Sequence, residues 1–231
     1  MALGGSYASG SNSFAAAAAN NTSSYGATGA NSVAMGALAK AAGAYSVAIN
    51  NGAIATGSRA VCISEEGTAS GAYSTVIGGY QPNDRGITGR FVIGAATNFA
   101  QFSIFNLFRE TTDATPVVLS SNNGAGSAIN QVILPNNSAY AFSGIIVARQ
   151  KASGGTASAA WKIEGLIRRE ANAASTTLVA STVTVISNVP GWTLALSADT
   201  TNGGLAVTAT GAAATNIRWV ATVQTSEVTY A

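Results

Sequence analysis

Residues 30–36 read Ala-Asn-Ser-Val-Ala-Met-Gly, and residues 44–50 read Ala-Tyr-Ser-Val-Ala-Ile-Asn. The same seven-residue frame can be followed over residues 4–94, apart from residues 18–22 and a nine-residue stretch at 79–87. Self-similarity at a fixed period is the sequence signature of a repeat architecture. The repeat predicts that the first part of the chain stacks equivalent structural units.

A period of seven first suggests a coiled coil, but the seventh position of the frame is usually Gly. Each Gly inside a helix costs about 1 kcal/mol, and coiled coils need large apolar residues at two positions of the heptad. A Gly at this spacing suits a short strand followed by a tight corner, where Gly can adopt a positive φ. We therefore expect one strand and one corner in each frame.

The fifth position of the frame is small in almost every repeat. Its occupants are Ala8, Ala15, Ala27, Ala34, Ala41, Ala48, Ala55, Cys62 and Ala69. Side chains alternate between the two faces of a strand, so the fifth position faces away from the fourth and sixth. A position that stays small indicates a narrow interior shared by all strands. Such an interior has no room for a ligand pocket, and Cys62 is expected to act there as a small apolar residue.

The fourth and sixth positions follow a longer period of fourteen residues. In alternate frames they are bulky and apolar, and in the frames between they are mixed or polar, as at Lys40 and Thr68. One coil then has two strands, of which only one presents an apolar outer face. Exposed apolar patches mark interfaces, and three such rolls packed about an axis would bury the patch. The predicted trimer-interface residues are Val33, Met35, Val47, Ile49, Val61, Ile63, Ile77, Phe91 and Ile93.

The segment Asn31-Ser32-Val33-Ala34-Met35-Gly36 resembles the head repeat of YadA-type trimeric adhesins, whose motif reads Asn-Ser-Val-Ala-Ile-Gly. Ser46-Val47-Ala48-Ile49 repeats the centre of that motif. The resemblance implies a left-handed parallel β-roll and a homotrimer. We expect this roll to form a stalk over residues 1–95.

The remaining residues, 96–231, differ in composition and hold all three Trp residues. Short runs of alternating residues, separated by turn clusters, predict nine strands and an antiparallel β-sandwich that is jelly-roll-like. Residues 161–170 could also form an amphipathic helix, but a central Gly165 favours a strand. The predicted strands are 101–109, 115–120, 130–134, 138–150, 158–169, 176–187, 191–197, 203–210 and 215–229.

Two further segments, residues 130–135 and 197–205, are similar to C-terminal modules of fibre proteins from marine phages. This resemblance implies a homotrimeric phage tail-fibre or receptor-binding tip, assembled in the host cytoplasm and carried on the virion. Its partners would be other virion tail proteins and a polysaccharide or protein of the host surface. No receptor-binding residue can be assigned from the sequence. A capsid head fibre and a bacterial trimeric adhesin fragment remain alternatives, and a polysaccharide-degrading tailspike is a second one.

The composition argues against several other functions. Charged residues make up 9% of the chain and the net charge is +2, with no stripe of Lys and Arg of the kind that nucleic-acid binding needs. No apolar run is long enough to span a membrane, and no signal peptide precedes the repeat, so we expect assembly in a cytoplasm or a start inside a longer chain. A charge-poor, apolar chain of this kind is expected to hide surface by forming an oligomer.

Enzymatic chemistry also has little support in the sequence. There is no His, which removes the commonest general base and metal ligand, and we expect no cofactor and no metal. A tailspike would need two carboxylates in one groove, and Glu110 and Asp113 are the closest pair in the second domain. Acids in turns are usually solvated, so we interpret this pair as a turn. The three Trp residues lie in alternating runs and are expected to pack in the core rather than stack on sugars.

Overall fold

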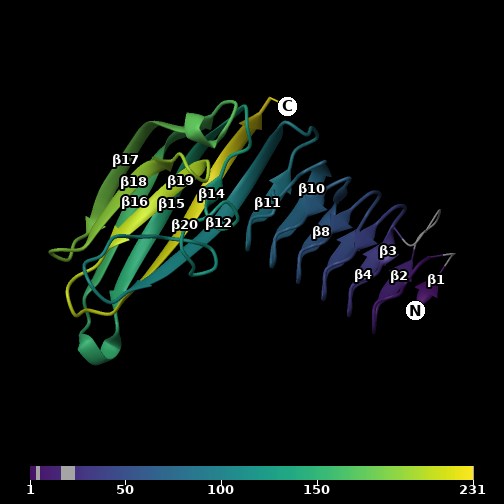
Figure 1. Cartoon of the computed structure of the whole chain (residues 1–231), viewed down its shortest axis with the longest axis horizontal. Helices are drawn as coiled ribbons and strands as arrows, with labels where there is room; N and C mark the ends of the chain where they lie inside the picture. The colour runs from purple at the N-terminus through teal and green to yellow at the C-terminus, as the bar shows by residue number, and fades with distance from the viewer. Residues whose placement is uncertain (4–5, 17–23, 231) are drawn as a thin grey trace. The chain divides into compact units, whose positions relative to one another are not determined.

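The computed structural model describes residues 1–3, 6–16 and 24–230. The protein is all-β, as predicted. It divides into two compact units, Met1–Ser103 and Ile104–Ala231 (Figure 1). Strand β12 (Ala100–Thr111) contains the boundary between the units, which are described separately below.

The first unit is a parallel β-solenoid of about six turns. Its chain alternates between a wide sheet and a narrow sheet, and Figure 1 shows the successive coils stacked side by side. The wide sheet runs in the order β1 (Ala2–Leu3), β2 (Phe14–Ala16), β4 (Val33–Met35), β6 (Val47–Ile49), β8 (Val61–Glu65), β10 (Thr75–Tyr80) and β11 (Phe91–Gly94). The narrow sheet consists of β3 (Gly26–Ala27), β5 (Lys40–Ala41), β7 (Ile54–Ala55) and β9 (Thr68–Ala69). The repeat residues 4, 5, 17 and 23 lie outside the described residues.

The strand register confirms the fourteen-residue coil. Ala34 pairs with Ala48 and Ala48 pairs with Cys62 in the wide sheet, while Ala41 pairs with Ala55 in the narrow sheet. All five side chains are at most 2% exposed and belong to one core cluster between the sheets. The fifth position therefore lines a narrow interior, as the sequence predicts, and Ala-sized groups fill it.

The glycines of the seventh position have two different roles. Gly43 and Gly57 do not have a positive φ, and a Cβ on Gly43 would lie 2.0 Å from the carbonyl oxygen of Gly57. At this corner the left-handed conformation belongs to Tyr45 and Arg59, with φ of 60° and 59°. The prediction of a Gly-supplied positive φ is wrong here, because Gly is needed to let successive coils approach backbone to backbone. At the opposite corner the prediction holds, since Gly78 has a φ of 64°.

The last coil places a charge where earlier coils place a methyl group. Asn83 forms a parallel bridge with Thr68, so Asp84 takes the interior position that Ala69 takes one coil earlier. Asp84 is 0% exposed and Arg90 is 1% exposed. A guanidinium nitrogen of Arg90 donates to the backbone oxygen of Asp84 at 3.3 Å. A polar cluster therefore closes the apolar interior at this end.

The Asp84 carboxylate is held by the backbone around it. It accepts hydrogen bonds from the N–H groups of Ser70 at 3.0 Å, Gly71 at 2.7 Å and Gly86 at 3.0 Å, and from the Ser70 hydroxyl at 3.0 Å. Buried polar groups are tolerated when they are fully hydrogen-bonded, and a carboxylate is the side chain that can accept from several donors at once. Asp84 thus compensates for its own burial and orders the corner after β9.

The C-terminal unit contains two antiparallel sheets. The larger sheet runs in the order β12 (Ala100–Thr111, which begins in the first unit), β20 (Ile217–Thr229), β15 (Ser138–Gln150), β16 (Ser158–Arg169) and β17 (Thr177–Ser187). The smaller sheet contains β13 (Val117–Val118), β19 (Gly204–Thr210), β14 (Val132–Ile133) and β18 (Thr193–Asp199). Two short 3₁₀ helices, η1 (Ala152–Gly154) and η2 (Ala173–Ser175), lie in the connections. The nine predicted strands are confirmed, and those at 138–150 and 158–169 match at both ends.

The ambiguous segment 161–170 lies largely in strand β16, which confirms the strand interpretation. Gly165 stands directly opposite Phe142 of β15. A Cβ on Gly165 would lie 2.6 Å from the Phe142 ring, which is 4% exposed. The Gly that argued against a helix is therefore the residue that lets an aromatic ring of the neighbouring strand cover the sheet.

The three Trp residues form one cluster in the C-terminal core. The ring of Trp219 lies 5.4 Å from that of Trp161 and 5.9 Å from that of Trp192, measured between centroids. The indole N–H of Trp219 donates to the Thr111 hydroxyl at 3.0 Å. All three rings are at most 4% exposed. The prediction that they pack in the core is confirmed.

We expect Ala48→Leu to destabilise the solenoid, because the added carbons have no space in the interior. Overpacking of this kind costs roughly 1–3 kcal/mol per chain. The midpoint of chemical denaturation, followed by circular dichroism, measures the effect. Thr56→Leu, at an exposed position of the solenoid, is the matched control and should leave the denaturation midpoint nearly unchanged. Equal midpoints for the two variants would show that the fifth position does not line the interior.

We expect Asp84→Ala to cost more than a typical surface change, since three N–H donors lose their acceptor and the one on Gly71 is buried. One unsatisfied buried donor costs about 1–3 kcal/mol, so the free energy of unfolding should fall by at least about 1 kcal/mol. Asp113→Ala removes a carboxylate that only caps an exposed turn and is the control. Hydrogen exchange should show the amides of Ser70, Gly71 and Gly86 losing protection in the Asp84 variant. Unchanged protection there would contradict the assigned role.

Candidate functional site

The nine residues predicted to form an interface lie together on the outer face of the wide sheet. Strand register aligns them in two columns, which continue from coil to coil. The first column contains Val33, Val47, Val61 and Phe91, with Thr75 between the last two, and the second contains Met35, Ile49, Ile63, Ile77 and Ile93. We call these nine residues the apolar stripe. Their role in an interface stays a prediction.

The apolar stripe faces outward in the single chain. Met35, Ile63 and Ile93 are 41%, 43% and 40% exposed, and the other six residues are half-buried. Single exposed apolar residues are normal, but a continuous apolar surface marks a binding surface. The stripe carries no charged side chain, so a partner would have to meet it with apolar groups rather than with complementary charge.

The narrow sheet presents a different outer face. Its outward positions are Lys40, Ile54 and Thr68, which pair in register across β5, β7 and β9. A cation and a hydroxyl flank the one large apolar side chain of this set. The two sides of the solenoid are therefore chemically unequal, which is the asymmetry that the fourteen-residue period predicts.

One corner of the solenoid carries an exposed aromatic and cationic ladder that the sequence analysis missed. The Arg59 guanidinium carbon lies 5.1 Å from the ring centre of Tyr45 and 5.3 Å from that of Tyr73. Such cation–π contacts contribute about 0.5–1 kcal/mol each at exposed sites. The signal was available, because the three residues stand at the second position of frames fourteen residues apart. The spacing alone does not show that these side chains stack, because that depends on how the coils align with one another.

The two candidate catalytic acids, Glu110 and Asp113, have different hydrogen-bond partners in the structure. An Asp113 carboxylate oxygen accepts from the Thr115 N–H at 2.7 Å, and this bond holds the pKa of Asp113 below its ordinary value. Glu110 accepts from the Arg218 guanidinium at 3.4 Å. Asp113 therefore caps its own turn, as the sequence predicts. The turn interpretation is wrong for Glu110, which lies in strand β12.

The cysteine and the possible metal-ligating side chains give little support for a catalytic site. Cys62 is fully buried in the solenoid interior, and burial raises the pKa of its thiol. Over residues 1–3, 6–16 and 24–230, no group of three or more His, Cys, Asp or Glu is placed to hold a metal ion. Over the same residues, no helix has the length and apolar character to cross a membrane.

The sequence matches no protein-family model and no curated protein. Among solved structures, the chain is similar to the tailspike protein of Acinetobacter phage vB_ApiP_P1, at 13% sequence identity and a TM-score of 0.28. The similarity covers 96% of this chain and 48% of the tailspike chain, so this chain spans less than half the length of that protein. A TM-score of this size does not establish a shared fold, and we infer function from the chain's own geometry.

We expect Val47→Asp to prevent self-association through the apolar stripe. The change would place a carboxylate at the centre of a surface that must be dehydrated to pack, at a cost of several kcal/mol for each unpaired charge. Lys40→Asp on the narrow sheet is the control and should leave assembly unchanged. Light scattering after size-exclusion chromatography compares the particle masses. Equal behaviour of the two variants would refute the assignment of the stripe as the contact surface.

Proposed function

We propose that this chain is a homotrimeric, non-enzymatic phage tail-fibre protein that adheres to the host cell surface through its C-terminal unit. The observation that carries the proposal is the apolar stripe, an uncharged surface that extends in register along the wide sheet from β4 to β11. A surface of this length on a single chain calls for a permanent partner. Because the outward apolar positions repeat along the coils, we favour further copies of this chain as that partner.

A second copy fits the stripe better than an unrelated partner does. Each coil repeats the same two outward apolar positions, so parallel copies in register would set Val47 against Val47 and Ile49 against Ile49 at one level. A symmetric assembly of this kind repeats one contact without needing a second surface. The resemblance to YadA-type repeats favours three copies. We further propose a left-handed roll and, in the C-terminal unit, a sandwich of the two antiparallel sheets.

The receptor contact is assigned to the C-terminal unit because the solenoid interior is filled by small side chains. Loops on a fixed scaffold are the usual place for variable recognition. Residues 121–128, 151–156 and 199–204 connect the strands and are rich in Asn, Ser, Thr and Gly. These side chains supply hydrogen bonds but little acid–base chemistry. Three copies on one particle would convert weak single contacts into avid binding.

The alternatives differ in location or in chemistry. A capsid head fibre or an adhesin fragment would use the same stripe and the same trimer. A tailspike would require two carboxylates that flank a saccharide bond. Glu110 is bonded to Arg218 and Asp113 to its own turn, which favours binding over hydrolysis.

The test uses the full chain, labelled with a fluorophore and incubated with cultured marine bacteria and with polysaccharide extracted from them. We expect saturable binding to the cells of at least one strain and no release of oligosaccharide. Equally labelled serum albumin is the control for nonspecific adhesion. Release of oligosaccharide that disappears in a Glu110→Gln or Asp113→Asn variant would establish a tailspike instead. Absence of binding to every strain tested would contradict a receptor-binding role.

A further inference from the structure

Two adjoining hollows lie on the C-terminal unit, at the end of the larger sheet. The first, of about 360 Å³, is bordered by Phe108, Asn123 and Val220. The second, of about 370 Å³, is bordered by Arg149, Lys151 and Asn216. Glu110 and Arg218 border both hollows, so the two are neighbours across the β12–β20 pair. We call them together the β12–β20 groove.

The groove gathers positive charge. Arg109, Arg149, Lys151 and Arg218 line it, which is four of the eleven Lys and Arg residues of the chain. Glu110 is the one acidic residue among the described groove residues. With four cations and one carboxylate, the groove has a local net charge that exceeds the net charge of +2 of the whole chain. An anionic ligand is therefore favoured here over the rest of the surface.

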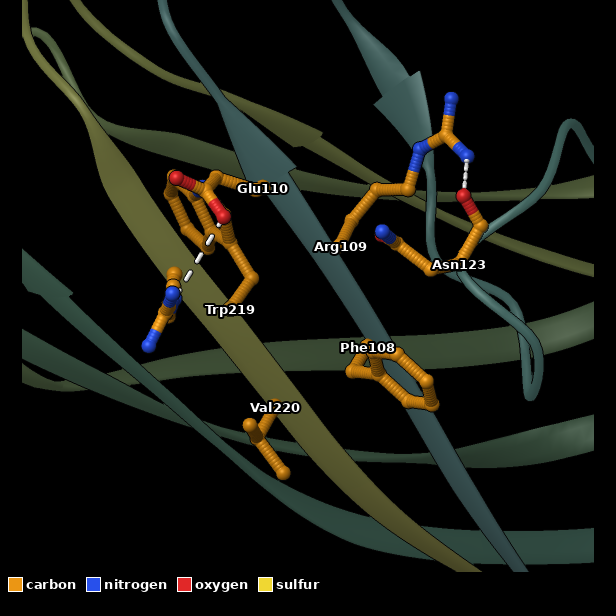
Figure 2. A pocket seen from close by; sticks show the side chains of 7 residues that line it. Phe108, Arg109, Glu110, Asn123, Trp219 and Val220 are labelled. Carbon is orange, nitrogen blue, oxygen red and sulfur yellow. Dashed lines mark hydrogen bonds and ion pairs between the residues drawn. The ribbon is translucent and has the colours of Figure 1, made fainter.

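The cations differ in how far they are already engaged. Arg109 donates to the backbone oxygen of Asn123 (Figure 2), and one nitrogen of Arg149 donates to the backbone oxygen of Thr156 at 2.9 Å and to Ser158 at 3.0 Å. The Arg218 side chain is 81% exposed and pairs with Glu110 at 3.4 Å. Exposed ion pairs of this kind contribute little to stability. Arg218 is thus the cation best placed to exchange its partner for a ligand.

The floor of the groove is apolar. Phe108 on β12 and Val220 on β20 are 39% and 45% exposed, and Figure 2 shows them on neighbouring strands below Glu110 and Arg109. Val220 pairs with Val147 of β15, which is 49% exposed and continues the apolar surface. An aromatic ring beside aliphatic groups offers a flat contact for the C–H face of a sugar ring.

The rim supplies the remaining chemistry that a sugar requires. Asn123, Gln150 and Asn216 carry amides that can both donate to and accept from hydroxyl groups. Guanidinium groups pair with carboxylates in a bidentate manner and bind sulfate by the same donors. An apolar floor, amide groups at the rim and several cations together match a saccharide that carries acidic groups. Nucleic acid would need cations along an extended path, and these cations are confined to one end of the sheet.

We infer that the β12–β20 groove binds an anionic saccharide, a run of sugar rings bearing carboxylate or sulfate groups. The inference rests on the proposed function, since it names the ligand class through which the C-terminal unit would meet a cell surface. Arg218 and Lys151 provide charge, Phe108 provides the stacking surface, and Glu110 repels the ligand. Removal of the Glu110 charge should therefore tighten binding, whereas a catalytic acid would be needed for activity.

The experiment measures binding of the full chain to three immobilised polymers by biolayer interferometry. Polygalacturonate presents carboxylates, dextran sulfate presents sulfates, and dextran is neutral. We expect binding to one or both anionic polymers, no binding to dextran, and an apparent Kd that rises with salt. The double variant Arg218→Gln/Lys151→Gln should weaken binding by about tenfold or more, as the loss of charge-assisted hydrogen bonds implies. Glu110→Gln should bind more tightly than the native chain.

The control is Lys162→Gln/Arg168→Gln, which removes two exposed cations from strand β16 of the same sheet, outside the residues that line the groove. It changes the net charge by the same amount, so nonspecific attraction would weaken both double variants equally. That equality, or absence of binding to both anionic polymers, would overturn the inference. Competition by single-stranded DNA as strong as by the preferred polymer would overturn it in favour of nucleic acid. Binding to bacterial cells together with failure on all three polymers would leave the proposed function standing and remove only this inference.

Discussion

Successive coils of the solenoid share an interior that admits only Ala-sized side chains, and the rest of the first unit follows from that limit. Ala34, Ala48 and Cys62 stack directly above one another because the coils repeat after fourteen residues. A narrow interior leaves little apolar volume inside the coil. The larger apolar residues of the repeat must therefore point outward, where they form the apolar stripe. In the proposed trimer, self-association would supply the burial that the coil itself cannot provide.

The outer surfaces of the two units differ in chemical character. The solenoid repeats one outward pattern, and a repeated pattern suits contacts between identical copies. The C-terminal unit has a compact core around Trp219. Its outer face does not repeat one pattern of side chains. Such a face can recognise something other than itself, because cations, amides and an aromatic ring lie within one groove.

Much of this could be predicted from the sequence, because its signals were local or periodic. The period of seven, the small fifth position and the alternation along β20 depend only on residues near one another in the chain. The role of Gly43 could not be predicted in this way, since a Gly that permits a positive φ and a Gly that permits close backbone approach look the same in a sequence. Gly165 was correctly interpreted, although its contact with Phe142 was not foreseen.

The features that escaped prediction all depend on contacts between distant residues. Asp84 breaks the small-residue rule of the fifth position, and only the strand register shows that it lies in the interior. Glu110 and Arg218 stand 108 positions apart in the chain and meet across neighbouring strands. No composition or spacing reveals the β12–β20 groove, because its cations are scattered through the sequence and are gathered only by the sheet.

The central claim is that copies of this chain bury the apolar stripe around a common axis, and the mass of the native particle tests it most directly. Sedimentation equilibrium of the unmodified chain in native buffer measures that mass without assuming a shape. We expect a single species with three times the 22.9 kDa mass of one chain, and this mass should not change on dilution to low micromolar concentration. A stable 22.9 kDa particle with a folded solenoid would contradict it.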